Sequence, residues 1–334
     1  MTKTRVLAGR QVFPVALGCM NLSHAYGRAY GEAASIQFLN DALDAGIDCL
    51  DTAAIYGDGE NERLLGKAVM SRRDEFFLCS KCVLSIVDGK RGLNGRPEVI
   101  TATLDGALQR LGTEHIDLYY MHRLDPTVPV EESVGALADA KAAGKIGAIG
   151  LSEMSADTLR RAHTEHPIAA MQSEYSPMVR NPEIAVLEAC KELDVAFVAF
   201  SPVSRGLLSE AVTEEAYGEG DIRAKMPRFR EPQLSHNLKT ITLFNALARD
   251  NGYTPAQLAI AWVLAEDEHV IALPGTRSLE HLKEDMSGAA VTLDPDLRAE
   301  ASALFEGDAI RGARYAKWMQ DMVTTELFEG EELA

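Results

Sequence analysis

Short, continuously apolar runs alternate along this chain with longer stretches in which hydrophobic residues recur every three or four positions. The eight runs are residues 15–19, 47–50, 76–80, 116–121, 146–151, 168–172, 196–200 and 270–273. Most of them begin about 25 to 35 residues apart, the spacing that repeated strand–helix units require. Because polar residues do not alternate within the runs, we expect strands buried on both faces, as in a parallel sheet covered by helices.

The stretches between these runs have the pattern of amphipathic helices. They are residues 33–45, 61–70, 97–111, 131–143, 155–163 and 182–193. Gly46, Gly112 and Gly144 each follow one of them, as glycines at helix C-termini do. Eight strand–helix repeats predict an α/β fold of the closed (β/α)8 TIM-barrel class. The alternative is an open doubly wound sheet, but its Gly-x-Gly-x-x-Gly dinucleotide-binding sequence is missing.

One interval breaks the regular spacing, because about 70 residues separate the seventh run from the eighth. They comprise a predicted loop over residues 201–232 and helical patterns over 235–251 and 254–265, and a further helix is expected at 296–305. A loop of this length in a compact domain is usually functional or disordered. We find no linker, so residues 1–334 are predicted to form a single barrel domain. Residues 324–334, which carry Glu326, Glu329, Glu331 and Glu332, are expected to be an acidic, frayed tail.

Composition narrows the classes of function. The 334 residues carry a net charge of −17, which disfavours binding to nucleic acid or anionic lipid. No window approaches 18 uncharged apolar residues, so no membrane span is expected. Five cysteines are too few for a disulfide scaffold, and with no apolar run of signal-peptide length they indicate a cytoplasmic protein. The expected partner is a small molecule, and the oligomeric state is left open.

Four reactive side chains fall at the ends of the predicted strands, where α/β barrels place their active sites. Asp51 and Tyr56 follow the second run, Lys81 ends the third and His122 follows the fourth. An ammonium buried in a barrel mouth needs a counter-charge, which Asp51 can supply. At about 4 Å and an effective dielectric near 20, Lys81 would attract a tyrosinate by roughly 4 kcal/mol before desolvation losses. We therefore expect a Tyr56 pKa lowered by up to two or three units from about 10. A neutral His122 could orient a substrate oxygen.

These residues and five further motifs resemble the aldo-keto reductase superfamily. The first is Asp51-Thr52-Ala53-Ala54-Ile55-Tyr56-Gly57 with Lys81 and His122 at their separations. The others are Gly18-Cys19-Met20, Gly150-Leu151-Ser152-Glu153, Gln172-Ser173-Glu174-Tyr175-Ser176, Phe200-Ser201-Pro202-Val203-Ser204-Arg205-Gly206-Leu207-Leu208 and Leu273-Pro274-Gly275-Thr276-Arg277-Ser278. The resemblance runs from about residue 15 to 285. Residues 150–153 and 221–229 look like the branch of bacterial and plant reductases with broad aldehyde and ketone specificity.

The resemblance implies NADPH-dependent reduction of carbonyl compounds, an alcohol dehydrogenase (NADP+)-type reaction with no metal ion. Tyr56 would be the general acid, Lys81 and Asp51 the pair that sets its pKa, and His122 the group that orients the substrate. Ser152, Glu153 and Gln172 would hold the nicotinamide amide, and Phe200 would stack beneath its ring.

The remaining cofactor contacts are implied in the same way. The loop at 201–208 would clamp the pyrophosphate, Thr276 and Arg277 would meet the 2′-phosphate, and Glu284 and Asp285 the adenine. The full predicted cofactor set is Gly18, Cys19, Met20, Ser152, Glu153, Gln172, Phe200, Ser201, Pro202, Val203, Ser204, Arg205, Gly206, Leu207, Gly275, Thr276, Arg277, His281, Glu284 and Asp285. Phosphate groups in barrels of this class bind after strands seven and eight, which agrees with these positions.

This chain departs from the commoner family pattern at four of these positions. Glu153 stands where many members have Asn, and Phe200 where many have Tyr. His281 replaces an Arg or Gln, and Asp285 replaces an Asn. Losing an Arg beside the 2′-phosphate weakens the preference for NADPH, but Arg277 and Arg205 remain, so NADPH is favoured over NADH.

Two other functions stay open at this point. A barrel lyase or aldolase could use Lys81 as a Schiff-base amine, which would require a low amine pKa and no close counter-charge. A regulatory module could bind the cofactor and turn over slowly. Tyr26, after the first strand, either lines the substrate pocket or covers the barrel.

Overall fold

The computed structural model describes residues 4–27, 30–87 and 90–334, and in this part of the chain eight parallel strands form one sheet. Their spatial order is β12, β11, β10, β9, β8, β5, β4 and β3. The bounds are β3 Leu17–Gly18, β4 Cys49–Asp51, β5 Phe77–Cys82, β8 Ile116–Met121, β9 Ile146–Ser152, β10 Ile168–Glu174, β11 Ala196–Phe200 and β12 Val270–Leu273. Each strand overlaps one of the eight predicted apolar runs.

The first and last strands meet, which closes the sheet into a barrel. Val15, just before β3, forms a parallel bridge with Ala272 on β12. The Ala16 amide donates to the Ala272 carbonyl at 2.8 Å, and the Gly18 amide donates to the Pro274 carbonyl at 2.8 Å. The predicted (β/α)8 barrel is therefore confirmed, and the open sheet was the wrong alternative.

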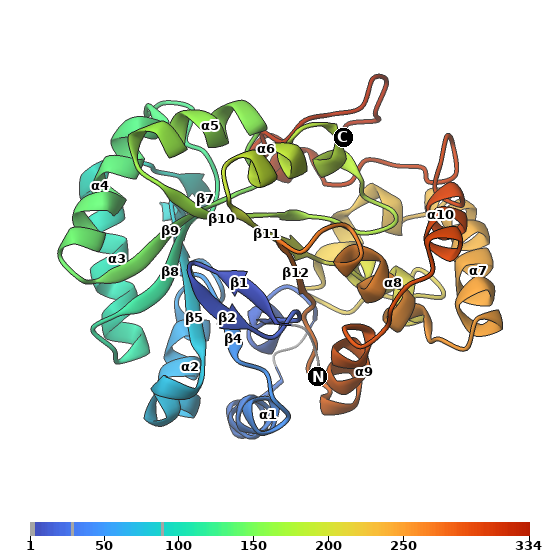
Figure 1. Ribbon diagram of the computed structural model, residues 1–334, viewed down its shortest axis with the longest axis horizontal. Helices are drawn as coiled ribbons and strands as arrows, with labels where there is room; N and C mark the ends of the chain where they lie inside the picture. Colours follow the sequence, from blue (N-terminus) through green and yellow to red (C-terminus); the bar gives the residue numbers. More distant parts are fainter. Residues whose placement is uncertain (1–3, 28–29, 88–89) are drawn as a thin grey trace.

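Helices surround the barrel (Figure 1). The helices that follow successive barrel strands are α1 Glu32–Asp44, α2 Glu60–Val69, α3 Pro97–Leu111, α4 Val130–Ala142, α5 Ala156–Glu165, α6 Val186–Glu192, α8 Pro255–Leu264 and α9 Leu279–Gly288. The additional ones are α7 Gln233–Asp250, α10 Pro295–Ala303 and α11 Lys317–Gln320. The helix expected over 182–193 is divided into a 3-10 turn at Asn181–Ile184 and α6, because Ala185 has a non-helical φ of −157°.

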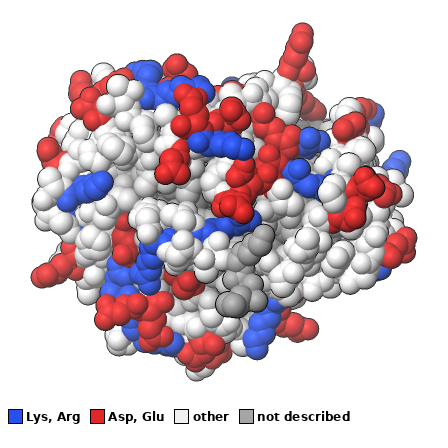
Figure 2. Space-filling view, viewed as in Figure 1, with Lys and Arg blue, Asp and Glu red and all other residues white. Residues whose placement is uncertain are grey.

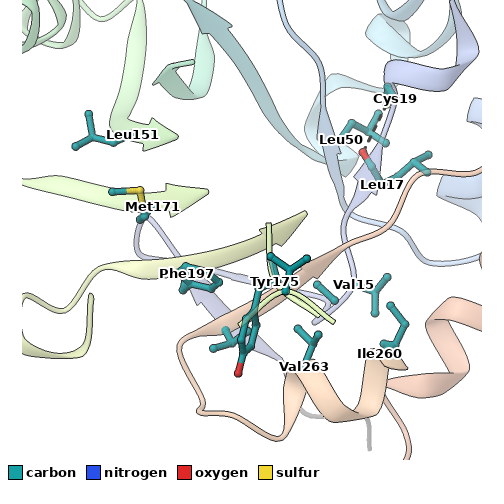
Figure 3. Packing of buried hydrophobic residues seen from close by; sticks show 14 of the residues in the cluster. Val15, Leu17, Cys19, Leu50, Leu151, Met171, Tyr175, Phe197, Ile260 and Val263 are labelled. Carbon is teal, nitrogen blue, oxygen red and sulfur yellow. Dashed lines mark hydrogen bonds between the residues drawn. The ribbon is translucent and has the colours of Figure 1, made fainter. Parts of the chain in front are cut away.

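Both faces of the barrel strands are buried, as the continuous apolar runs predicted. Cys49, Phe77 and Leu118 point into the barrel with Ala196 and other small or apolar residues. The alternate residues face the helices and form the larger cluster. Figure 3 shows part of it, where Ile260 and Val263 on α8 lie close to Val15 and Phe197.

A short hairpin that the sequence patterns did not predict covers the end of the barrel where the strands begin. It consists of β1 Arg5–Leu7 and β2 Arg10–Val12, which lie across the barrel in Figure 1. Leu7 and Val12 are buried against the inner cluster. This hairpin leaves the opposite end, where the strands finish, for a functional site.

Two other segments add structure at that opposite end. A second unpredicted hairpin, β6 Leu84–Val87 with β7 Lys90–Leu93, follows β5. The predicted loop at 201–232 contains three short 3-10 turns, Ser204–Ser209, Ile222–Lys225 and Pro227–Phe229. The Ile222 amide donates to the Ala25 carbonyl at 2.8 Å, which joins this loop to the one after β3.

The acidic tail, expected to be frayed, is held by hydrogen bonds in the structure. The Thr324 amide donates to the Glu153 carbonyl at 3.1 Å. The Ala156 amide at the start of α5 donates to Glu326 at 2.7 Å, and Asn181 donates to Glu331 at 2.6 Å. These carboxylates meet amide donors, one of them at the positive end of a helix.

Acidic side chains form scattered patches, interspersed with basic ones, on the face shown in Figure 2, and the net charge is −17. Among the described residues, no helix combines the length and the apolar character needed to cross a membrane.

Candidate active site

A cleft of about 860 Å³ opens where the barrel strands end. At one end it is lined by Asp51, Tyr56 and His122. Its lining also includes Arg277 and Asp285, which belong to the segment after β12. One continuous space therefore joins the predicted catalytic residues to the predicted nucleotide-binding residues.

Lys81 lies behind Tyr56 and is fully buried. It projects from the inner face of β5, and its Nζ donates to the Asp51 carboxylate and, at 2.9 Å, to the Thr52 carbonyl. The same nitrogen lies 5.3 Å from the centre of the Tyr56 ring. Gln172 donates to the other oxygen of Asp51 at 2.9 Å. The three residues that the sequence placed on one rim are thus in mutual reach.

The pKa of Tyr56 differs from the sequence-based expectation. Burial raises this pKa above its ordinary value of 10.0 and outweighs the Lys81 ammonium, which lowers it. The expected net decrease was wrong because the Coulomb estimate omitted the cost of removing a phenolate from water. Tyr56 is therefore a neutral phenol near pH 7, with its proton available for donation.

The pKa of Lys81 shifts in the direction that keeps it charged. Burial alone lowers this pKa, but Asp51 and Tyr56 raise it, and the net shift is upward. A raised pKa is opposite to what a Schiff-base lysine requires.

His122 faces Tyr56 edge-on, with 5.8 Å between the ring centres and 83° between the ring planes. Burial and then the charges of Arg123 and Lys81 hold its pKa well below 6.5, so the imidazole is neutral, as expected. Its Nδ1 is buried without a hydrogen-bond partner among the described residues. The ring can therefore present a neutral hydrogen-bonding nitrogen beside the Tyr56 phenol.

Most of the predicted cofactor residues line the cleft. They are Gly18, Met20, Ser152, Gln172, Phe200, Ser201, Val203, Arg205, Gly206, Gly275, Thr276, Arg277, His281, Glu284 and Asp285, and Tyr26 lines it as well. The predicted residues outside the lining are Cys19, Glu153, Pro202, Ser204 and Leu207. Residues from separate barrel strands and loops are thus brought to one surface.

Glu153 was expected beside the nicotinamide amide, but its carboxylate is directed elsewhere. It is fully buried, pairs with Arg314 at 2.6 Å and accepts from the Glu174 amide at 2.8 Å. Its backbone has a φ of +54°. Glu153 therefore anchors the C-terminal segment instead of contacting the cleft.

Arg205 also differs from its expected role, because its charge is already compensated. Its Nη2 donates to Glu174 at 3.0 Å, and its guanidinium lies 5.8 Å from the centre of the Phe200 ring. Arg205 still lines the cleft, so its contribution to the phosphate preference stays a prediction, as does that of Arg277. Arg277 lies over Tyr30, 5.7 Å from the ring centre.

Asp285 is buried in the cleft wall. Burial, and to a lesser extent Glu284, raises its pKa to about 8. Near pH 7 this carboxyl is mostly protonated, so it offers an O–H donor and a carbonyl acceptor, much as an Asn amide offers a donor and an acceptor.

Sequence patterns missed several residues of the cleft. Among them are His24, Arg91, Arg123, Trp318, Met319 and Met322. Arg123 directly follows His122, and that adjacency was an available signal. The others come from loops, from the hairpin after β5 and from the C-terminal segment, and no periodicity marks them.

Comparison with known proteins agrees with this geometry. Residues 14–304 match the model of the Aldo/keto reductase family. The chain is 37% identical over 320 residues to aldo-keto reductase yakc (NADP(+)) of Schizosaccharomyces pombe, covering 93% of this chain and 94% of the relative.

Solved structures of aldo-keto reductases are also similar to this chain. A thermostable aldo-keto reductase, Tm1743, is 28% identical, with a TM-score of 0.74 over 90% of this chain and 99% of that one. Aldo-keto reductase AKR11C1 from Bacillus halodurans is 25% identical, with a TM-score of 0.76 over 91% and 96%. A glycerol dehydrogenase from Gluconobacter oxydans, at 24% identity, shares the fold with a TM-score of 0.83. The match to the family model over most of the chain, together with these relatives, shows that the protein belongs to the aldo/keto reductase family.

Proposed function

We propose that this protein reduces aldehydes or ketones to alcohols with NADPH, as an alcohol dehydrogenase (NADP+)-type reductase. The observation that carries the proposal is the cluster of Tyr56, Lys81, Asp51 and His122 at one end of the cleft. The relative from S. pombe carries NADP(+) in its name, and a related structure from Klebsiella pneumoniae holds NADPH.

The cleft residues fit a dinucleotide. Phe200 offers an aromatic face near the catalytic cluster, and Ser152 and Gln172 offer polar groups there. At the other end, Arg277 and the N-terminus of α9 suit a phosphate group, since a helix N-terminus attracts anions. Gly18 and Gly275 allow their two backbone segments to lie close together at the cleft, because a Cβ on Gly18 would lie 3.2 Å from the Pro274 carbonyl oxygen.

Each catalytic side chain then has a chemical task. When bound, the reduced cofactor supplies a hydride to the carbonyl carbon. Tyr56 donates its phenolic proton to the carbonyl oxygen, and Lys81 stabilises the tyrosinate that remains. Asp51 keeps the Lys81 ammonium charged and in place. His122 donates a hydrogen bond that orients the substrate oxygen, as a neutral imidazole can.

Two other functions were left open by the sequence. The Asp51 partner and the raised pKa of Lys81 argue against the Schiff-base lyase. The slow-turnover regulatory module has the same residues as the enzyme and differs only in rate. The measured turnover number decides between the reductase and the regulatory module.

The test is a panel of aldehydes and ketones assayed by loss of reduced-cofactor absorbance, with NADPH and NADH in parallel. Tyr56→Phe should lower kcat by about 100-fold or more, because it removes the proton donor, and should leave the Kd for NADPH nearly unchanged. Tyr119→Phe serves as the matched control, because it removes a buried hydroxyl on the outer face of β8, away from the cleft. Equal turnover by wild type and Tyr56→Phe would remove Tyr56 from the mechanism.

A further inference from the structure

Arg91 is a half-buried cation in the cleft wall at the catalytic end. It lies on β7, and its Nη2 donates to His24 Nε2 at 2.6 Å. Its guanidinium carbon lies 5.3 Å from the centre of the Trp318 ring. The His24 ring is stacked on Tyr56, with 6.4 Å between centres and 16° between planes. The His24 ring therefore lies between the Arg91 guanidinium and the Tyr56 phenol.

No carboxylate within the described residues forms an ion pair with Arg91. Three buried cations do have carboxylate partners: Lys81 has Asp51, Arg205 has Glu174 and Arg314 has Glu153. His24 cannot offset the charge, because an imidazole is either neutral or cationic; burial, and then the nearby Arg91, lower its pKa to about 4, so it is neutral here. A partly buried guanidinium without a counter-charge is costly unless an anion binds to it.

The charge around the reacting groups is positive although the whole protein is negative. Lys81, Arg91 and Arg123 lie near Tyr56 and His122, and the pKa of His122 is lowered by all three. At this end of the cleft, the acid within the described lining is Asp51, which is already paired with Lys81. The local field therefore favours an anionic group beside the carbonyl.

The surfaces next to Arg91 are apolar. Ile55, Leu84 and Met322 form a cluster with the Tyr56 ring, and Trp318 and Met319 also line the cleft. Such a wall suits a carbon skeleton, and the Arg91 guanidinium at its edge suits an anionic group on that skeleton. A planar guanidinium presents two parallel N–H donors in the geometry of a carboxylate.

We propose that Arg91 binds the carboxylate of the substrate, so that the physiological substrate is an aldehyde or ketone with an apolar body and a carboxylate group. This inference rests on the proposed function. A phosphate ester shares the anionic chemistry, and the experiment includes one to distinguish the two groups.

The experiment compares matched aldehydes. The kcat/KM values for 3- and 4-carboxybenzaldehyde are measured against those for their methyl esters and for 4-formylphenyl phosphate, with NADPH. Wild type should prefer a carboxylate over its ester. Arg91→Met should lower that acid-to-ester ratio by about 10- to 100-fold, mostly through KM, because it removes a charge-assisted hydrogen bond.

Two further variants make the result specific. Arg91→Lys retains the charge and should keep part of the preference. Arg63→Met removes an arginine that pairs with Glu60 on the exposed surface of α2, and it should leave the ratio at the wild-type value. Competitive inhibition of wild type by benzoate, and its absence with benzamide, tests the site even if Arg91→Met does not fold.

The outcomes separate the two proposals. Reduction of the esters as fast as the acids by wild type would overturn the role of Arg91 and leave the reductase intact. A higher kcat/KM for the phosphate ester would overturn the carboxylate assignment. Failure to reduce any aldehyde or ketone of the wider panel would overturn the proposed function itself.

Discussion

At the residue scale, the site depends on how each buried charge is compensated. Lys81 and Asp51 form a buried ion pair, and Gln172 donates a hydrogen bond to the second oxygen of the Asp51 carboxylate. Tyr56 and His122 are kept neutral because burial disfavours their charged forms. The cluster therefore holds one proton donor and one neutral hydrogen-bonding group beside a fixed ammonium.

Asp285 gives a prediction about pH. Its carboxyl is mostly protonated at pH 7 and ionises as the pH rises through about 8. Loss of the O–H donor should raise the KM for NADPH by about 10-fold at pH 9. Asp285→Asn cannot ionise and should show a flat profile in the same assay. A wild-type KM that stays constant from pH 7 to 9 would show that Asp285 does not contact the cofactor.

Arg277 gives a prediction about cofactor choice. Arg277→Ala should weaken NADPH binding by about 10-fold or more and NADH binding far less, because a guanidinium–phosphate hydrogen bond is lost only with NADPH. Fluorescence titration of both cofactors measures the two Kd values, and NADH acts as the internal control. Equal losses would place the 2′-phosphate elsewhere in the cleft.

At the element scale, a packing contact between the neighbouring strands β8 and β9 supports Lys81. The Tyr120 ring on β8 lies 5.7 Å from Lys81 Nζ and packs against Gly150 on β9. A Cβ on Gly150 would come within 2.3 Å of that ring. Gly150 is therefore required for the close approach of the ring and not for an unusual backbone angle.

Gly150→Ala should destabilise the protein by about 1–3 kcal/mol, because the Tyr120 ring must move in a packed interior. It should also lower kcat, since the ring supports Lys81. Urea unfolding measures the first effect and steady-state kinetics the second. Gly135→Ala on α4 is the control, because a Cβ there meets no atom within 4 Å. Equal stability of the two variants would contradict the tight packing.

Elements differed in how well they could be predicted. Strands β8, β11 and β12 and helix α3 were predicted with their observed bounds, because each is either predominantly apolar or strongly periodic. The hairpins β1–β2 and β6–β7 were missed because their strands are only three or four residues long and carry polar residues. A short strand that also carries polar residues leaves no apolar run to distinguish it from a loop.

At the scale of the whole molecule, the C-terminal segment lines part of the cleft and forms hydrogen bonds with residues that are distant in the sequence. Trp318, Met319 and Met322 line the cleft, and hydrogen bonds on both sides hold this segment. The Gly312 amide donates to Glu332 at 3.0 Å, and the Thr324 amide donates to the Glu153 carbonyl. The tail thus contributes to the shape of the proposed substrate pocket. A single domain over residues 1–334 stays a prediction.

Removal of residues 324–334 should lower the free energy of unfolding by about 1–3 kcal/mol, since several hydrogen bonds are lost. The KM for aldehydes should rise, because Trp318 and Met322 are less firmly held, while the Kd for NADPH should change little. Removal of Leu333 and Ala334 alone is the control. Unchanged KM and stability in the longer truncation would show that the tail has no part in the site.

The sequence by itself determined the barrel and brought forward the four residues of the proposed catalytic cluster. Apolar runs indicate burial on both faces of the strands. Because the strands are parallel, polar residues near their carboxyl ends lie at the same rim of the barrel. Only the tertiary structure decided the rest, because it depends on contacts between distant segments. These contacts turned Glu153 toward Arg314, paired Arg205 with Glu174, raised the pKa of Tyr56 by burial and left Arg91 in the cleft without a carboxylate among the described residues.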